Sequence, residues 1–245
     1  MRTIDAKDMH YKDLNAMIKN LFKRNEKEIL IKNVEGQRYI GNGIQGNYKI
    51  TIEGTPGNDM AAYMDGPSII VHGNAQDGIA NTMNNGEIII HGNAGDTLGY
   101  AMRGGEVYIK GNVGYRTGIH MKEYLEKNPV IVIGGKTGDF LGEYMTGGTI
   151  ILLGLYLDDP QKIVGGYCGT GMHGGAIYSR IPIDSYKLGK EVKQVQADDK
   201  DMESISSYVM KFCNYFGFEY DSIIGQRFFK IYPYNKRPYK NLYAY

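Results

Sequence analysis

Residues 86–111 read Gly-Glu-Ile-Ile-Ile-His-Gly-Asn-Ala-Gly-Asp-Thr-Leu-Gly-Tyr-Ala-Met-Arg-Gly-Gly-Glu-Val-Tyr-Ile-Lys-Gly, which is one full repeat and the start of the next. Working outward from this stretch, anchor glycines recur every 19 residues. After a five-residue insertion the anchor returns, and it returns once more 19 residues later. A fixed period of about 20 residues is typical of stacked, equivalent units. The anchors are Gly54, Gly73, Gly92, Gly111, Gly135 and Gly154.

A five-residue run before each anchor has the pattern of a strand. Alternation along a strand places its second and fourth residues on one face. The second slot is always Ile or Val, and the fourth is apolar in every repeat except at Ser179. Both slots are therefore predicted to point into a core. The second slot holds Ile50, Ile69, Ile88, Val107, Ile131, Ile150 and Ile177.

Half of the chain's methionines share one slot of the repeat, with Gly or Ala three residues earlier. A sulfur-rich metal or cofactor track is one interpretation. We favour flexible side chains that fill a narrow core, because the column keeps step with the strand slots. Asn74, Asn93 and Asn112 follow successive anchors and suggest a ladder at a corner. The methionines are Met64, Met83, Met102, Met121, Met145 and Met172.

These patterns predict an all-β solenoid, a right-handed parallel β-helix of about seven coils. Residues 1–36 are expected to form an N-terminal cap with a helix over 8–24 and a strand over 28–34. Residues 37–180 form the coils. Residues 181–245 form a C-terminal extension with a helix over 199–216 and a tyrosine-rich tail.

The third strand slot faces outward and is mostly apolar, and such a stripe is expected to be covered. We expect the C-terminal helix to cover part of it and a partner subunit the rest. Tyr108 would then be a partner contact, and nearby charged corner residues would form its polar rim. The rim residues are Arg103, Arg116, His120, Lys122 and Glu123.

Composition excludes several classes of function. The 245 residues carry 28 basic and 27 acidic side chains, a net charge of +1, so no general attraction to nucleic acid or anionic lipid is expected. The polar N-terminus does not resemble a signal peptide, and the longest apolar run, 149–157, is too short to span a membrane. Two cysteines make no disulfide framework. These features favour a cytoplasmic location.

Three patterns could carry chemistry, and we interpret each as structural. The runs Gly41–Gly46 and Gly169–Gly174 match a dinucleotide-binding pattern, but strand-like sequences follow where a helix is required. His72 and His91 stack as a possible metal pair without a third ligand. We therefore predict no catalytic, cofactor or metal site in this chain.

The third pattern is the stacked pair Glu87 and Glu106. These residues are the only candidates for a rival function, that of a β-helix carbohydrate-active enzyme. Their spacing of roughly 5 Å follows from any two adjacent coils, however, so it is weak evidence for catalysis.

Residues 36–180 resemble the GXGXG repeat domain at the C-terminal end of the large subunit of glutamate synthase. The resemblance lies in Gly92–Asp96, Ala101–Gly105, Gly111–Arg116 and especially Gly142–Gly148 with the following Ile-Ile-Leu-Leu-Gly. It is closest to the stand-alone, archaeal-type version, and one of the subunits of formylmethanofuran dehydrogenase shares the repeat.

The resemblance implies an architectural subunit of a glutamate-synthase-like complex, with a formylmethanofuran dehydrogenase as the alternative. In the glutamate synthase family, glutamine amide nitrogen is transferred reductively to 2-oxoglutarate. The amidotransferase domain and the domains for FMN and iron–sulfur clusters, which are absent here, perform that chemistry. The expected partners are the subunits that carry them, with homo-oligomerisation as a further possibility.

Overall fold

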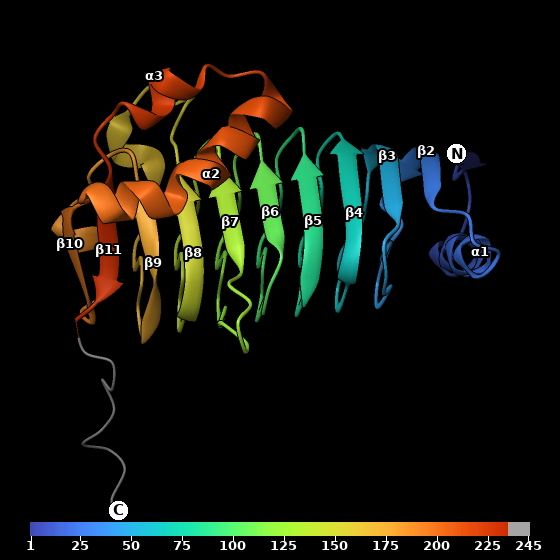
Figure 1. The fold of residues 1–245 in the computed structure, drawn as a ribbon, viewed down its shortest axis with the longest axis horizontal. Coiled ribbons are helices and arrows are strands. Elements are labelled where there is room, and N and C mark those ends of the chain that lie inside the picture. The colour runs from blue at the N-terminus through green and yellow to red at the C-terminus, as the bar shows by residue number, and fades with distance from the viewer. Residues whose placement is uncertain (235–245) are drawn as a thin grey trace, which may run out of the picture.

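The structure, a computed structural model, describes residues 1–234, and its centre is one sheet of eleven strands. The strands stack side by side along the long axis of the molecule (Figure 1). From β1 to β9 every neighbouring pair is parallel and follows chain order. The strands are β1 Arg2–Asp5, β2 Glu28–Glu35, β3 Lys49–Thr55, β4 Asp65–His72, β5 Asn85–Ile90, β6 Glu106–Ile109, β7 Val130–Ile133, β8 Thr146–Leu152, β9 Gly174–Ser179, β10 Val192–Gln196 and β11 Phe229–Pro233.

The prediction of an all-β parallel solenoid is confirmed, and the solenoid has about six turns. The repeat fixes the register, because the second-slot residues pair directly, as in Ile69 with Ile88 and Ile88 with Val107. Both inward slots are buried from β3 to β9. Ser179 is also buried, and its hydroxyl donates to the carbonyl of Ile181 at 2.5 Å, so the exception in the pattern is satisfied locally.

Across the core from the strands lies a second wall, which has an unusual backbone. It consists of seven five-residue segments, and the first, middle and last residue of each has a positive φ. We call it the left-handed wall. A left-handed conformation costs about 1–2 kcal/mol for most residues other than glycine. The segments are 39–43, 59–63, 78–82, 97–101, 116–120, 140–144 and 167–171.

Hydrogen bonds continue from coil to coil through this wall. The last residue of a segment donates its N–H to the following coil, as Tyr63 does to the Asn81 carbonyl at 2.8 Å. The middle residue donates to the preceding coil, as Gly99 does to the Ile79 carbonyl at 2.8 Å. The left-handed wall is therefore a hydrogen-bonded counterpart of the strand wall, built from a different conformation.

The middle position of each segment faces the strand wall across the core and is always Gly or Ala. A Cβ built on Gly99 would lie 2.5 Å from Cδ1 of Ile131, and one on Gly118 would lie 2.6 Å from Cδ1 of Ile150. Ala61 and Ala80 occupy this position in two coils and are fully buried. Close packing against the inward isoleucines thus limits the middle position to the smallest residues.

The methionine column fills the space between the walls. Met64, Met83, Met102, Met121, Met145 and Met172 are all fully buried. At the anchor positions adjacent coils approach closely. A Cβ on Gly73 would lie 2.4 Å from the Gly54 carbonyl oxygen, and Cβ atoms on Gly92, Gly111 and Gly135 would lie 2.1–2.3 Å from the asparagine oxygens of the preceding coil. At Gly154 the nearest atom would be Cδ1 of Ile163, 2.8 Å away.

The asparagine ladder bonds side chain to backbone. The amide oxygen of Asn74 accepts from the N–H of Asn93 at 2.8 Å, and that of Asn93 accepts from the N–H of Asn112 at 2.7 Å. Asn112 continues the ladder to the N–H of Lys136 at 2.9 Å. Each asparagine thereby satisfies a donor at the corner of the next coil.

At the N-terminal end, helix α1 (Tyr11–Lys23) packs Leu14, Ile18 and Phe22 on the solenoid core. The ring of Phe22 stacks on Tyr48 at 4.1 Å between centroids. The strand β1, which the sequence analysis did not predict, pairs with β2 and extends the sheet by one strand.

At the C-terminal end, the chain turns back and closes the sheet with two antiparallel strands. β11 pairs with β9 and β10 pairs with β11. Between these strands, helices α2 (Asp199–Phe216) and α3 (Tyr220–Ile224) lie over the outer face of the sheet (Figure 1). Two short 3-10 helices, η1 (Pro160–Ile163) and η2 (Ser185–Lys187), connect the other elements. Tyr239, Tyr243 and Tyr245, part of the predicted aromatic tail, lie outside the described residues.

Candidate functional site

Helix α2 forms an apolar contact with the outward stripe of the strand wall. Its own apolar face, Ile205, Val209, Phe212 and Phe216, is buried against the stripe. From β5 to β9 the stripe is buried, at Ile70 it is partly buried against the same cluster, and at Thr51 it is partly exposed. The helix therefore covers the C-terminal half of the stripe and leaves the N-terminal half uncovered. The covered residues are Ile89, Tyr108, Val132, Ile151 and Tyr178.

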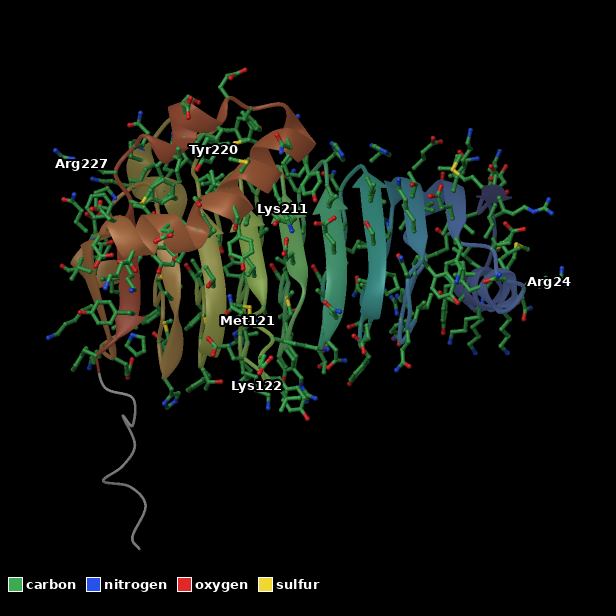
Figure 2. The ribbon with its side chains drawn as sticks, in the orientation of Figure 1. Arg24, Met121, Lys122, Lys211, Tyr220 and Arg227 are labelled. Carbon is green, nitrogen blue, oxygen red and sulfur yellow. The ribbon has the colours of Figure 1, made fainter. Side chains whose placement is uncertain are left out.

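The stacked carboxylates Glu87 and Glu106 lie where α2 meets the sheet. The Nζ of Lys211 lies 2.7 Å from Oε2 of Glu106 and 4.0 Å from Oε1 of Glu87. The Tyr215 hydroxyl donates to Glu87 at 2.7 Å, and the Tyr108 hydroxyl donates to Glu106 at 2.5 Å. Figure 2 shows Lys211 extending from α2 beside the middle strands. Both carboxylates thus bind donors from α2, which fasten the helix to the sheet.

The electrostatics of this cluster follow from burial and from its two carboxylates. Burial and then the hydrogen bond to Glu106 raise the pKa of Tyr108 far above its ordinary value, and burial and Glu87 raise the pKa of Tyr215. Burial opposes the charge of Lys211, but Glu106 and then Glu87 outweigh it, so the pKa of Lys211 is raised. Both phenols stay protonated as donors and the lysine stays charged at neutral pH.

The placement of Tyr108 corrects the sequence-based expectation of a partner contact there. Its side chain is fully buried and packs edge-on against Tyr215 of α2, with 5.1 Å between ring centroids. The contact that was assigned to another subunit is made within the chain. Tyr108 is therefore not exposed for a contact with another subunit, and the charged corner residues do not surround it.

The charged corner residues lie on and beside the left-handed wall instead. Arg116 pairs with Glu143 at 3.1 Å and lies over the ring of Phe140 at 5.3 Å. Arg103 lies over the ring of Tyr124 at 5.9 Å. Of the other charged corner residues, His120 lies in the wall, and Lys122 and Glu123 lie in the loop that follows it.

His120 belongs to the last position of its left-handed segment and lies between two aromatic rings. It stacks on Tyr144 with centroids 5.3 Å apart and meets Tyr100 edge-on at 5.9 Å. In the adjoining loop, Oε1 of Glu123 accepts from the N–H of Gly148 at 3.3 Å, and Lys122 is exposed at the edge of the solenoid away from α2 (Figure 2).

The histidine pair has a structural environment. The rings of His72 and His91 stack with centroids 4.8 Å apart, and His91 meets Phe216 of α2 edge-on at 5.2 Å. Burial, and then the charges of His72 and Lys110, lower the pKa of His91. Within residues 1–234 no group of three or more His, Cys, Asp or Glu side chains is placed to hold a metal ion.

The two dinucleotide-like runs belong to the left-handed wall. Gly41 and Gly43 are the middle and last residues of its first segment, and Gly169 and Gly171 are those of its seventh. Strands β3 and β9, not helices, follow them. Without a helix N-terminus after the last glycine, these runs lack the feature that binds a pyrophosphate.

The sequence analysis missed the exposed aromatic face of the left-handed wall. In the first and last positions the side chains point outward, and several are large residues in a conformation that favours glycine. Tyr63 is 55% exposed at φ 57°, and Tyr167 is 60% exposed at φ 62°. A tyrosine in a slot that other coils fill with glycine was the available signal. The large residues in these positions are Tyr39, Tyr63, Arg116, His120, Phe140, Tyr144 and Tyr167.

No helix in the described part of the chain is long and apolar enough to cross a membrane. Comparison with protein families matches residues 4–234 to the GXGXG motif family. An uncharacterised protein of Methanocaldococcus jannaschii is 47% identical over 249 residues, covering 98% of this chain and 95% of that protein. The chain belongs to the GXGXG motif family.

Proposed function

We propose that this chain is a non-catalytic, architectural subunit of a glutamate-synthase-like complex. In this proposal the amidotransferase chemistry, the FMN and the iron–sulfur clusters reside on partner subunits in the cytoplasm. Those subunits transfer glutamine amide nitrogen reductively to 2-oxoglutarate. Membership of the GXGXG family and the long parallel solenoid support this assignment.

The observation that carries the proposal is the engagement of Glu87 and Glu106 by α2. A carbohydrate-active enzyme would need two carboxylates open to a sugar and a water. Here Lys211 and Tyr215 of α2 bind the carboxylates of Glu106 and Glu87. The two glutamates are themselves paired neighbours in the sheet. The cluster therefore works as a fastening between helix and sheet.

Co-expression tests the proposed role directly. The chain would be produced with a candidate FMN and iron–sulfur subunit and a candidate amidotransferase subunit, and the complex isolated by size-exclusion chromatography. We expect co-elution, and a loss of glutamine-dependent glutamate formation when the chain is omitted. Elution of the chain alone, with full activity of the flavoprotein in its absence, would remove the architectural role.

The rival enzyme class has its own measurement. The purified chain would be assayed on a panel of polysaccharides beside a Glu106→Gln variant. We expect no turnover by either protein. Turnover by the wild type that the variant lacks would overturn the proposal in favour of a carbohydrate-active enzyme.

A further inference from the structure

We propose that the outer face of the left-handed wall is the docking surface for a folded protein partner with a basic contact surface. The inference rests on the proposed function, under which that partner is the FMN and iron–sulfur subunit. The face comprises the first and last positions of the left-handed segments and the residue immediately before each.

The backbone of the left-handed wall favours glycine at the first and last positions. Gly43, Gly78 and Gly171 show that glycine fits the first and last positions, where it avoids the penalty of a positive φ. Other coils place tyrosine, histidine, phenylalanine or arginine there at φ between 52° and 63°. Strained residues of this kind persist where the surrounding structure imposes them, and they cluster at functional sites.

Tyr63 differs from the left-handed residues whose backbone strain is offset by ring stacking. The Phe140 ring stacks on Tyr167 at 5.0 Å, and His120 stacks on Tyr144. Tyr63 makes no ring contact within residues 1–234, yet it keeps the left-handed conformation with 55% of its surface exposed. Packing within the described chain therefore does not account for its aromatic ring.

The exposed tyrosines give the outer face of the wall a composition typical of protein interfaces. Tyr63, Tyr100, Tyr115 and Tyr167 are each at least 40% exposed on this one side of the solenoid. Tyrosine and arginine are enriched in protein interfaces, where a tyrosine supplies a large contact area at low entropic cost. Rings on neighbouring coils pack in two groups, Tyr100 with His120 and Tyr144, and Phe140 with Tyr167. Aromatic groups spread over several coils suit a folded protein better than a small molecule, which binds in a concave pocket.

The net charge of the face indicates what kind of partner surface it would bind. Four carboxylates of the face are not buried, Asp59, Asp77, Asp96 and Asp139, and a fifth, Glu143, is buried and paired with Arg116. The other guanidinium group of the face is that of Arg38. The net charge of the face is −3, whereas the whole chain carries +1. Two copies of so acidic a face would repel each other, and a basic partner surface would be attracted.

The other long side of the solenoid is partly closed. Helix α2 covers the strand wall from β5 to β9, as Figure 1 shows for its C-terminal half. On the left-handed wall, helix α1 lies against the first segment, where the Asn15 side chain donates to the Arg38 carbonyl at 2.8 Å and Tyr11 meets Tyr39 with 5.7 Å between ring centroids. Helices α2 and α3 pack on the strand wall, so the left-handed wall has room for a partner beyond its first segment.

A triple variant, Tyr63→Gly with Tyr144→Gly and Tyr167→Gly, tests the proposal. Glycine is already used at equivalent positions, so the fold should keep its melting temperature within a few degrees while the face loses three rings. We expect affinity for the purified FMN and iron–sulfur subunit to fall about tenfold or more. Tyr186→Ala, which removes a tyrosine that is 77% exposed outside the wall, should bind like the wild type.

The outcomes separate the two proposals. A wild-type chain that does not bind the flavoprotein removes the proposed function, and this assignment falls with it. Equal binding by the wild type and the triple variant overturns the docking face alone. A wild-type dimer that the triple variant converts to a monomer assigns the face to a second copy. Wild-type affinity should fall with added salt, and salt-independent binding would contradict a basic partner.

Discussion

The two walls of the solenoid enclose the same core but restrict their residues in opposite ways. In the strand wall, any residue can adopt the backbone conformation, and the outer side chains from β5 to β9 are covered by α2. In the left-handed wall, three of the five backbone positions in each segment favour glycine, yet Tyr63 and Tyr167 occupy two of these positions and are exposed. The strand wall thus carries the internal contact of the chain, and the left-handed wall carries its exposed aromatic face.

The largest effect is expected from Met102→Asp, which places a charge between the two walls. Met102 is fully buried in the methionine column, and an unpaired buried charge costs several kcal/mol, on the order of the stability of a whole domain. We expect an unfolded or aggregated protein in circular dichroism and size-exclusion chromatography. Met210→Asp on α2, where the side chain is 47% exposed, is the control and should stay folded. A soluble, folded Met102→Asp protein would contradict the buried column.

A pair of valine variants compares positions within the left-handed wall. Gly43 and Gly99 share a positive φ, but a Cβ on Gly43 has no neighbour within 4 Å, and one on Gly99 would meet Ile131 at 2.5 Å. Gly43→Val should therefore cost only the backbone strain, about 1–2 kcal/mol. Gly99→Val should cost about 1–3 kcal/mol more through overpacking.

Urea unfolding of the two valine variants gives the difference in stability. Equal costs for both would show that the middle position does not face the core. A larger cost for Gly43→Val would reverse the assignment of inward and outward positions.

A smaller effect is expected where α2 is fastened to the strand wall. Tyr215→Phe removes the hydrogen bond to Glu87 and should destabilise the protein by about 1–2 kcal/mol, because the acceptor is a charged group. The control is Tyr186→Phe, a tyrosine that is 77% exposed outside this cluster. Equal unfolding midpoints for the two variants would show that the Glu87 contact contributes nothing to stability.

The smallest effect concerns pH. The pKa of His91 is lowered in the folded protein, so the unfolded chain binds a proton first as the pH falls. Stability should therefore decrease as the pH falls from above the ordinary value of 6.5 toward the folded pKa. Solvent screens this partly exposed ring, so we expect a loss below about 1 kcal/mol.

The matched variant for this pH dependence is His91→Gln, which cannot titrate. It should flatten the stability profile between neutral and mildly acidic pH, measured as melting temperature. An unchanged slope in the variant would assign the dependence to other groups.

The sequence predicted the features that recur with the repeat and the one strongly amphipathic helix after it. The inward strand slots, the methionine column and the helix over 199–216 follow from spacing and amphipathicity, and the structure places all three as expected. Contacts between distant segments have no such signature. The bond from Tyr215 to Glu87 joins residues 128 positions apart, and the antiparallel pairing of β11 with β9 lies outside the repeat.

The aromatic face illustrates the same limit at the level of single residues. Side-chain type reports φ weakly for any residue other than glycine, asparagine or aspartate. The residue types of Tyr63 and His120 therefore do not indicate a left-handed backbone by themselves; only the glycines in the same slot of other coils do. Tyr108 was expected at an interface because its slot is apolar and faces outward, and the pattern could not show that the covering element comes from the same chain.

The change from parallel to antiparallel pairing at β9 also fixes the length of the solenoid. A parallel stack that ended in two open parallel edges could add further copies end to end and grow into a filament. Here the sheet begins with parallel β1 and ends with antiparallel β10, so its two edges present different hydrogen-bond spacings. The two ends therefore do not match each other, which disfavours end-to-end addition of further copies through the sheet.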